Sequence, residues 1–206
     1  GVDPAATAAA VAFGAFANTG QICTSMERVY VHRDLAEPFV DALVEAAAAY
    51  TPGLGPLVDQ RQRDIVVRHV TDAVERGAVV RCGGVVPEGK GFYYPATVLT
   101  DVDESMLVMD EETFGPVAPV AVVSSFAEGL EKASATRYGL AATVYTGNPA
   151  HVAAARSLPA GVVWVNQWQG GGPERLYEPA GDSGMGATGS RAAYDAATRP
   201  MSIHCA

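Results

Sequence analysis

The run Gly161-Val162-Val163-Trp164-Val165-Asn166 is apolar at four consecutive positions. It lacks the alternation of a half-exposed strand, which is typical of a strand buried on both faces of a parallel sheet. Before it come Leu140–Thr146, which has strand character, and Pro149–Leu158, which has helical character. Strands that alternate with helices in this way indicate a parallel sheet covered by helices.

The same alternation extends toward the N-terminus. Asp3 can cap, and Pro4 can start, an Ala-rich helix that runs to Asn18 and that Gly20 can end. Further strands are expected at Arg28–His32, Val79–Arg81, Tyr93–Leu99 and Val117–Val123, and further helices at Leu35–Tyr50, Gln60–Arg76 and Phe126–Ser134. We therefore expect an α/β fold with a largely parallel sheet flanked by helices.

Length and charge limit the class of protein. A chain of 206 residues with 49% hydrophobic content can bury a core as one domain or one large lobe. Its net charge of −9 disfavours a phosphate-binding surface, so we expect neither nucleic acid nor a membrane as a partner. No apolar run approaches the roughly 20 residues that cross a bilayer, and residues 1–4 do not resemble the start of a signal peptide. We expect a cytoplasmic protein.

The cysteines and histidines are scattered, with no spacing typical of a metal site or a disulfide framework. They are Cys23, Cys82, Cys205, His32, His69, His151 and His204. An odd number of distant cysteines fits a reducing compartment. We expect no metal, and we expect each histidine to lie at the surface or to cap a helix.

The segment Asn18-Thr19-Gly20-Gln21-Ile22-Cys23-Thr24-Ser25-Met26-Glu27-Arg28 places a cysteine in a glycine-containing turn just past the expected first helix. Thr24 and Ser25 suit a helix cap, and a cysteine at a helix N-terminus can have a lowered pKa, which favours the reactive thiolate. An unpaired cysteine also serves commonly as a small buried apolar residue. From its placement alone, Cys23 is a candidate for either role.

Four motifs, in order, resemble the aldehyde dehydrogenase superfamily. The family's Phe-x-Asn-x-Gly-Gln-x-Cys signature and the Arg that follows it are matched by Phe16, Asn18, Gly20, Gln21, Cys23 and Arg28. Its Glu-Glu-x-Phe-Gly-Pro, Tyr-Gly-Leu-Ala and Gly-x-x-x-x-Asn segments are matched by residues 111–116, 138–141 and 161–166. The resemblance thus covers nearly the whole chain.

The resemblance implies NAD(P)-dependent oxidation of an aldehyde to a carboxylic acid. Cys23 would attack the aldehyde to form a thiohemiacetal, with its backbone amide as one oxyanion donor. Hydride would pass to the nicotinamide ring of NAD or NADP, and water would release the acid from the thioester. In the family the second Glu binds the ribose next to nicotinamide and the Phe packs near that ring, which makes Glu112 and Phe114 the implied cofactor contacts.

Trp168, with Gly170-Gly171-Gly172 and then Tyr177, falls where the family builds the mouth of its substrate tunnel. The resemblance makes Trp168 a candidate substrate-binding residue, although an aromatic side chain beside glycines can also simply cover the core. The following family segment, Pro-Phe-Gly-Gly-x-Lys-x-Ser-Gly, is altered here, with Ala180, Asp182 and Gly184 in place of Phe, Gly and Lys. No substrate can be inferred from that loop.

The resemblance assigns residues 1–206 to the catalytic domain alone. In the family the coenzyme-binding domain and the Glu general base precede the cysteine motif, in a chain more than twice this long. We therefore expect residues 1–206 by themselves to be inactive, because most of the cofactor site is missing. The alternatives are a coenzyme-A-acylating aldehyde dehydrogenase and a non-catalytic assembly or scaffold domain. Residues 200–205 could form a strand with a neighbouring subunit, so a homo-oligomer is expected.

Overall fold

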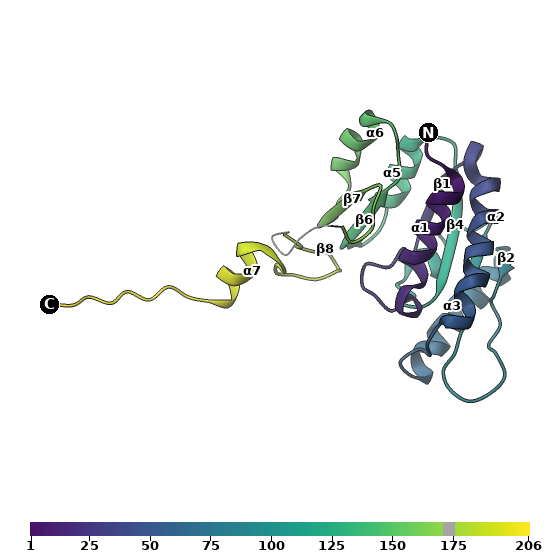
Figure 1. The fold of residues 1–206 in the computed structure, drawn as a ribbon, viewed down its shortest axis with the longest axis horizontal. Coiled ribbons are helices and arrows are strands. Elements are labelled where there is room, and N and C mark those ends of the chain that lie inside the picture. The colour runs from purple at the N-terminus through teal and green to yellow at the C-terminus, as the bar shows by residue number, and fades with distance from the viewer. Residues whose placement is uncertain (171–175) are drawn as a thin grey trace. The chain divides into compact units, whose positions relative to one another are not determined.

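A four-stranded sheet in the order β1-β4-β3-β2 organises the first half of the chain in the computed structural model (Figure 1). The structure describes residues 1–170 and 176–206, which divide into two units, residues 1–133 and 134–206. Strand β4 runs parallel to both β1 and β3, while β2 is antiparallel to β3 at the edge. The predicted α/β fold with a largely parallel sheet is confirmed, with one antiparallel strand added.

The elements of the first unit mostly match the predicted ranges. They are α1 (Pro4–Phe16), β1 (Val29–His32), α2 (Arg33–Tyr50), α3 (Gln60–Glu75), β2 (Val79–Cys82), β3 (Thr97–Thr100), α4 (Leu107–Asp110), β4 (Val117–Val123) and α5 (Phe126–Ser134), which ends at the first residue of the second unit. Short 3₁₀ turns cover Ala17–Gly20 and Thr51–Gly53. As predicted, the Asp3 side chain caps α1 by accepting the N–H groups of Ala5 and Ala6, and Pro4 is its first residue.

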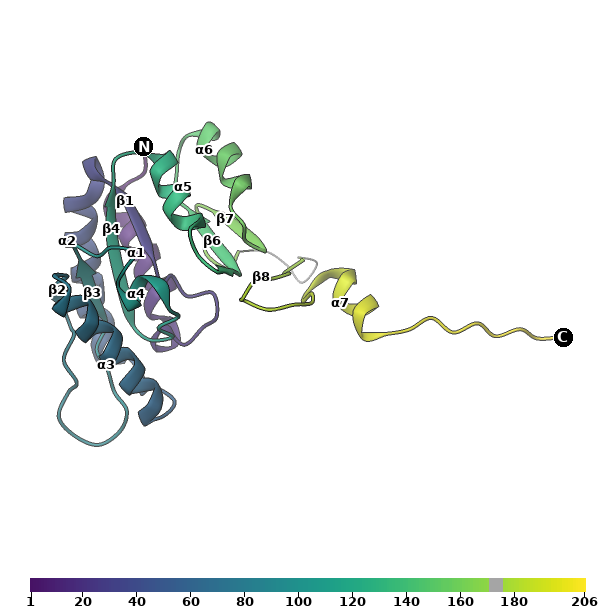
Figure 2. The ribbon, with the colours of Figure 1, turned by 180° about the vertical axis from the view of Figure 1, so that it is seen from behind.

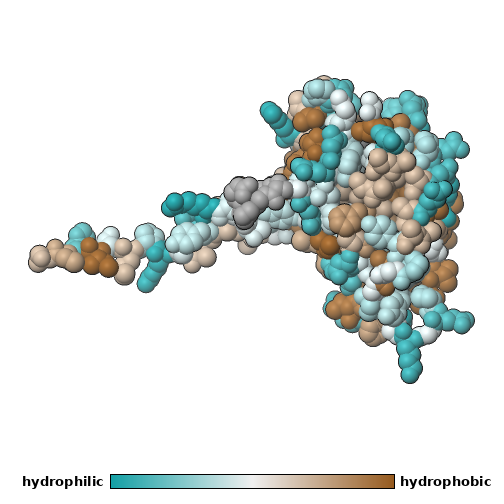
Figure 3. All heavy atoms as spheres, in the orientation of Figure 1, coloured by the Kyte–Doolittle hydropathy of each residue, from teal (hydrophilic) through white to brown (hydrophobic). Residues whose placement is uncertain are grey.

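Helices cover both faces of this sheet. Figures 1 and 2 show α1 and α2 on one face and α3 with α4 on the other. Val66 and Val70 of α3 and Met109 of α4 belong to one buried cluster with Leu99 and Val117 of the sheet. Polar and apolar side chains are interspersed on the surface that Figure 3 presents. The core therefore lies between the sheet and its helices. The segments that lead into the strands lie at the edge of the sheet.

The second unit is smaller and contains two separate strand pairs. Its elements are β5 (Tyr138–Gly139), β6 (Ala141–Val144), α6 (Pro149–Ala154), a 3₁₀ turn (Ala155–Ser157), β7 (Val162–Val165), β8 (Ala180–Gly181) and α7 (Ser190–Ala197). Strands β6 and β7 are parallel and are joined through α6, as the alternation of strand and helix predicts. Strands β5 and β8 are antiparallel.

Two strand predictions need correction. The strand expected from Tyr93 begins only at Thr97, because Pro95 has no backbone N–H to donate to a ladder. The run in β7 is not buried on both faces, since only Trp164 of its four residues is fully buried. No helix among the described residues is both long enough and apolar enough to cross a membrane.

Candidate active site

Cys23 lies in a sharp turn between α1 and β1. Three successive residues of the turn Ala17–Gly20, namely Asn18, Thr19 and Gly20, have positive φ angles of 51°, 60° and 71°. The Ser25 N–H donates to the Ile22 carbonyl at 2.8 Å and the Ser25 hydroxyl donates to the Gly20 carbonyl at 3.1 Å, closing the turn around Cys23. The Cys23 side chain is exposed. It is therefore not the small buried apolar residue that placement alone allowed.

No helix follows Cys23, which corrects the expectation that Thr24 and Ser25 cap one. The chain instead continues without regular structure to β1 at Val29. Thr24 is buried, and the Ser25 hydroxyl holds the turn. The Cys23 backbone N–H makes no hydrogen bond to any residue that the structure describes. A free amide next to an exposed thiol is the arrangement that an oxyanion donor requires.

Two side chains that precede Cys23 fasten the turn to residues 55–58. The Thr19 hydroxyl donates to the Gly55 carbonyl at 3.0 Å. The Gln21 side chain accepts the Val58 N–H at 2.9 Å and donates to the Pro56 carbonyl at 3.4 Å. These bonds tie the cysteine turn to the segment that leads into α3.

The turn also packs backbone against backbone on the segment Glu111–Gly115. A Cβ atom added to Gly20 would lie 2.1 Å from the Gly115 carbonyl oxygen. Real Cβ contacts are never this close, so any residue with a side chain at position 20 would push the two segments apart. Gly20 is thus required by both its positive φ and this contact.

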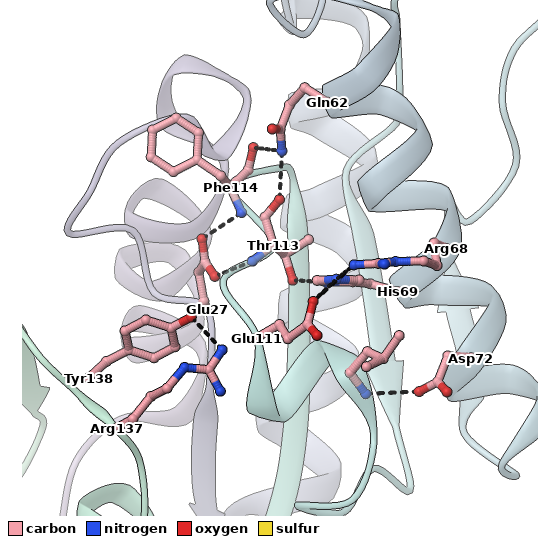
Figure 4. A network of polar contacts seen from close by, with 11 residues as sticks. Glu27, Gln62, Arg68, His69, Asp72, Glu111, Thr113, Phe114, Arg137 and Tyr138 are labelled. Atoms are coloured by element: carbon pink, nitrogen blue, oxygen red, sulfur yellow. Dashed lines mark hydrogen bonds and ion pairs between the residues drawn. The ribbon is translucent and has the colours of Figure 1, made fainter. Parts of the chain in front are cut away.

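The segment Glu111–Gly115 is held by side chains from two other parts of the first unit (Figure 4). The Glu27 carboxylate accepts the Thr113 N–H at 2.7 Å and the Phe114 N–H at 2.8 Å. The Gln62 amide donates to the carbonyls of the same two residues, at 2.8 and 3.1 Å. Phe114 has a φ of 48°, a left-handed conformation that bulky residues adopt only when their surroundings impose it.

His69 supports the same segment from α3, and its burial corrects the expectation of a surface or capping role. Its imidazole is fully buried and lies 3.1 Å from the Thr113 hydroxyl and 3.3 Å from the Glu111 carboxylate. Arg68 donates to the same carboxylate at 2.9 Å. Burial lowers the pKa of His69, although the bond to Glu111 acts in the opposite direction. His32, in contrast, does cap a helix, by accepting the Asp34 N–H.

The two implied cofactor residues lie on this held segment. Glu112 is exposed and its carboxylate has no hydrogen-bond partner among the described residues, whereas the carboxylate of its neighbour Glu111 contacts Arg68 and His69. The Phe114 ring is partly exposed. The contacts of the segment therefore leave available the two side chains that the family motif assigns to the coenzyme.

The sheet explains why Cys23 and the segment Glu111–Gly115 lie at the same edge. Strands β1 and β4 are parallel neighbours, with Val29 opposite Val120. The residues that enter parallel strands meet at one edge of the sheet, so the turn before β1 and the segment before β4 are adjacent. The sequence predicted no role at this site for Glu27, Gln62 or His69, and the one local signal for Glu27 was a carboxylate next to a strand.

Trp168 belongs to the second unit, where it is partly exposed. It lies three residues after the end of β7, and between them the side chain of Asn166 bonds both the N–H and the carbonyl of Thr146, at 2.8 and 2.9 Å. Gly171 and Gly172, named with Trp168 in the sequence, lie outside the described residues. The rings of Trp164 and Tyr177 are 6.4 Å apart between their centroids. No group of three potential metal ligands is found among the described residues.

Comparison with known proteins identifies the family. The sequence model described as the aldehyde dehydrogenase family matches residues 1–203. The chain belongs to the aldehyde dehydrogenase family. An aldehyde dehydrogenase of Paenarthrobacter nicotinovorans is 41% identical over 82% of this chain and 39% of its own length. The lactaldehyde dehydrogenase of Escherichia coli strain K12 is 39% identical over 73% of this chain and 33% of its own length.

Solved structures agree with this aldehyde dehydrogenase assignment. A crystal structure of lactaldehyde dehydrogenase from Escherichia coli has a TM-score of 0.88 and 34% identity, covering 93% of this chain and 42% of that one. An indole-3-acetaldehyde dehydrogenase with NAD+ has a TM-score of 0.88 and 32% identity, covering 94% and 41%. Pyridine nucleotides are therefore cofactors within the family. The chain spans about two fifths of the length of these relatives.

Replacing Gly20 by Ala should destabilise this aldehyde dehydrogenase chain. The new Cβ would both strain a positive φ and collide with the Gly115 carbonyl, so we expect a loss of about 2 to 4 kcal/mol in the free energy of unfolding. Urea denaturation followed by circular dichroism measures it. The control is Gly53→Ala, whose Cβ would meet nothing within 4 Å and which should change stability by less than about 0.5 kcal/mol. Equal effects of the two substitutions would refute the close contact.

Glu27 should make the stability depend on pH. Burial raises the pKa of its carboxyl from 4.5 to about 7, and the charge of Glu112 adds to the rise, while the two backbone hydrogen bonds and Arg28 lower it. The folded state therefore binds this proton more tightly than the unfolded state does. Stability from this group is fully present below pH 4.5 and is lost as the pH rises through about 7.

The Glu27→Gln variant cannot titrate at this position, so the difference between the two proteins isolates the effect. Relative to the variant, the wild type should lose up to about 3 kcal/mol of unfolding free energy between pH 4 and pH 8, at about 1.4 kcal/mol per pKa unit. Urea unfolding at several pH values tests this. A difference that stays constant over that range would show that the carboxyl keeps an ordinary pKa.

Proposed function

We propose that Cys23 is the nucleophile of an enzyme that oxidises an aldehyde to a carboxylic acid with NAD or NADP. The observation that supports this most strongly is the placement of the thiol. Cys23 is exposed in a turn that packs, at Gly20, against the segment bearing Glu112 and Phe114. The family motifs for nucleophile and coenzyme contact, 88 residues apart at Cys23 and Glu111, thus meet at one edge of the sheet.

The chemistry follows from the needs of an aldehyde. The Cys23 thiolate attacks the carbonyl carbon, a carbon–sulfur bond forms, and the free Cys23 N–H donates to the resulting oxyanion. The carbon–oxygen double bond then reforms as hydride leaves the same carbon, giving a thioester. The nicotinamide ring, when bound, supplies the acceptor for that hydride. Water adds to the thioester and the carbon–sulfur bond breaks, which releases the carboxylic acid, restores the thiolate and passes one proton to solvent.

The residues on the held segment suit a nicotinamide ribose. The Glu112 carboxylate can accept from both ribose hydroxyls because it is exposed and has no partner among the described residues. The partly exposed Phe114 offers a flat apolar surface next to it. The nicotinamide ribose is the same in NAD and NADP, so these contacts do not choose between the two cofactors.

We also propose that residues 1–206 act as the catalytic domain and need further residues for turnover. The chain corresponds to about two fifths of the length of its relatives, and the residues proposed here account for only the nucleophile and the nicotinamide side of the coenzyme site. A homo-oligomer is supported by the exposed apolar side chains of Met201 and Ile203 in the extended tail. A cytoplasmic location is supported by three cysteines that are all free.

The test of the function is cysteine-dependent turnover in the natural polypeptide that contains these residues. With a panel of aldehydes and either cofactor, Cys23→Ala should reduce the rate of NADH or NADPH formation by at least about a thousandfold, since the nucleophile forms both covalent intermediates. Cys205→Ala is the matched control, because Cys205 is equally exposed but lies in the tail. Turnover that survives Cys23→Ala would refute the mechanism. A strict need for coenzyme A would indicate the acylating reaction, and absence of turnover in the wild type would favour the non-catalytic scaffold domain.

The same panel tests Trp168 as a substrate-binding residue. We expect Trp168→Ala to change the order of preference among aliphatic and aromatic aldehydes by about tenfold or more, because a large ring shapes an apolar site. The ratio of kcat/KM values between two aldehydes is the quantity to compare. An unchanged ranking would leave Trp168 as a covering residue of the second unit.

A further inference from the structure

We propose that Glu27 is a positioning residue for coenzyme binding. Its carboxylate fixes two successive peptide groups of the segment Glu111–Gly115 and thereby sets the direction in which Glu112 and Phe114 point. The inference rests on the proposed function, since it assumes that these two side chains contact the nicotinamide half of the coenzyme. It adds a residue that touches neither substrate nor coenzyme.

The geometry of the contact requires a carboxylate. One Glu27 oxygen accepts the Thr113 N–H at 2.7 Å and the other accepts the Phe114 N–H at 2.8 Å. A carboxylate offers two acceptor oxygens and no donor, whereas the amide of Gln offers one acceptor and one donor group. A Gln at this position would therefore point an N–H group at one of the two backbone N–H groups and lose that bond.

These bonds act on the atoms that carry the coenzyme contacts. The Thr113 N–H belongs to the peptide plane that begins at the Cα of Glu112, so holding it orients the Glu112 backbone. The Phe114 N–H belongs to the next plane, and Gln62 holds the carbonyls of Thr113 and Phe114 from the other side. Successive peptide planes are thus fixed, and Phe114 is kept at its positive φ of 48°.

Glu27 also connects this segment to the nucleophile. It lies four residues after Cys23, and its neighbour Met26 is bonded through its N–H to the Gly14 carbonyl of α1 at 3.1 Å. The cysteine turn meets the same segment again at the contact of Gly20 with Gly115. One side chain therefore keeps the coenzyme contacts in register with the thiol, which is what hydride transfer between them requires.

The experiment is direct coenzyme binding by the natural polypeptide, followed by the fluorescence of NADH and of NADPH. Glu27→Gln should raise the Kd by about tenfold, the change expected from one lost hydrogen bond to a charged acceptor. Competition separates the two halves of the coenzyme. Nicotinamide mononucleotide should compete about tenfold more weakly in the variant, whereas adenosine monophosphate should compete as it does in the wild type.

Glu128→Gln is the matched control. The Glu128 carboxylate also accepts a backbone N–H, that of Ser124 at 2.8 Å, but it lies at α5, outside the contacts described for the segment. Its Kd for the reduced coenzymes should stay within twofold of the wild type. The rate of Cys23 alkylation by iodoacetamide without coenzyme should be unchanged in both variants, because neither alters the exposure of the thiol.

Each result decides the proposal. An unchanged Kd in Glu27→Gln, or equal weakening of both competing nucleotides, would overturn it. If Glu27→Gln does not fold, Glu27→Asp takes its place, because it keeps the charge on a shorter side chain. That variant must then weaken competition by nicotinamide mononucleotide while leaving competition by adenosine monophosphate unchanged. If the wild type binds coenzyme without oxidising aldehydes, the proposed function is refuted. The competition experiment then still tests the role of Glu27 in coenzyme binding. If the wild type binds neither coenzyme, both proposals fail.

Discussion

The Glu27 carboxylate accepts the N–H groups of both Thr113 and Phe114, and the arrangement of the site depends on this pair of bonds. It joins the segment entering β1 to the segment entering β4, whose strands the sheet has already placed side by side. Burial of the carboxyl raises its pKa to about 7. Ionising this group therefore lowers the free energy of unfolding as the pH rises through neutrality. Sites that hold charge in this way at the expense of stability are typical of functional regions.

Strained backbone occurs on both sides of the same contact. Asn18, Thr19 and Phe114 have positive φ angles, and the glycines that follow Thr19 and Phe114, Gly20 and Gly115, are in close contact. Such conformations persist only where neighbouring groups over-determine them, as Gln62 and Glu27 do for Phe114. The parallel strands behind the two segments supply a rigid base for the exposed thiol and carboxylate.

Family membership supports the proposed class of reaction but does not specify a substrate. Relatives of comparable identity carry the names of enzymes for lactaldehyde, succinate semialdehyde and betaine aldehyde. The residues proposed as nucleophile and coenzyme contacts, Cys23, Glu112 and Phe114, all lie in the first unit. The second unit contains Trp168 and the altered segment with Ala180, Asp182 and Gly184, where differences in the choice of aldehyde are expected to lie.

The sequence by itself determined the alternation of strands and helices, with β4 and α5 at their predicted bounds, and its short motifs made Cys23, Glu112 and Phe114 the candidate site residues. These features are local, because periodicity, caps and motifs depend on residues within a few positions of one another. Only the tertiary structure decided that His69 is buried and that Glu27 and Gln62 hold a segment more than 50 residues away. The partner of a buried polar group is set by which strands become neighbours in the sheet, and nothing in the local sequence around that group specifies it.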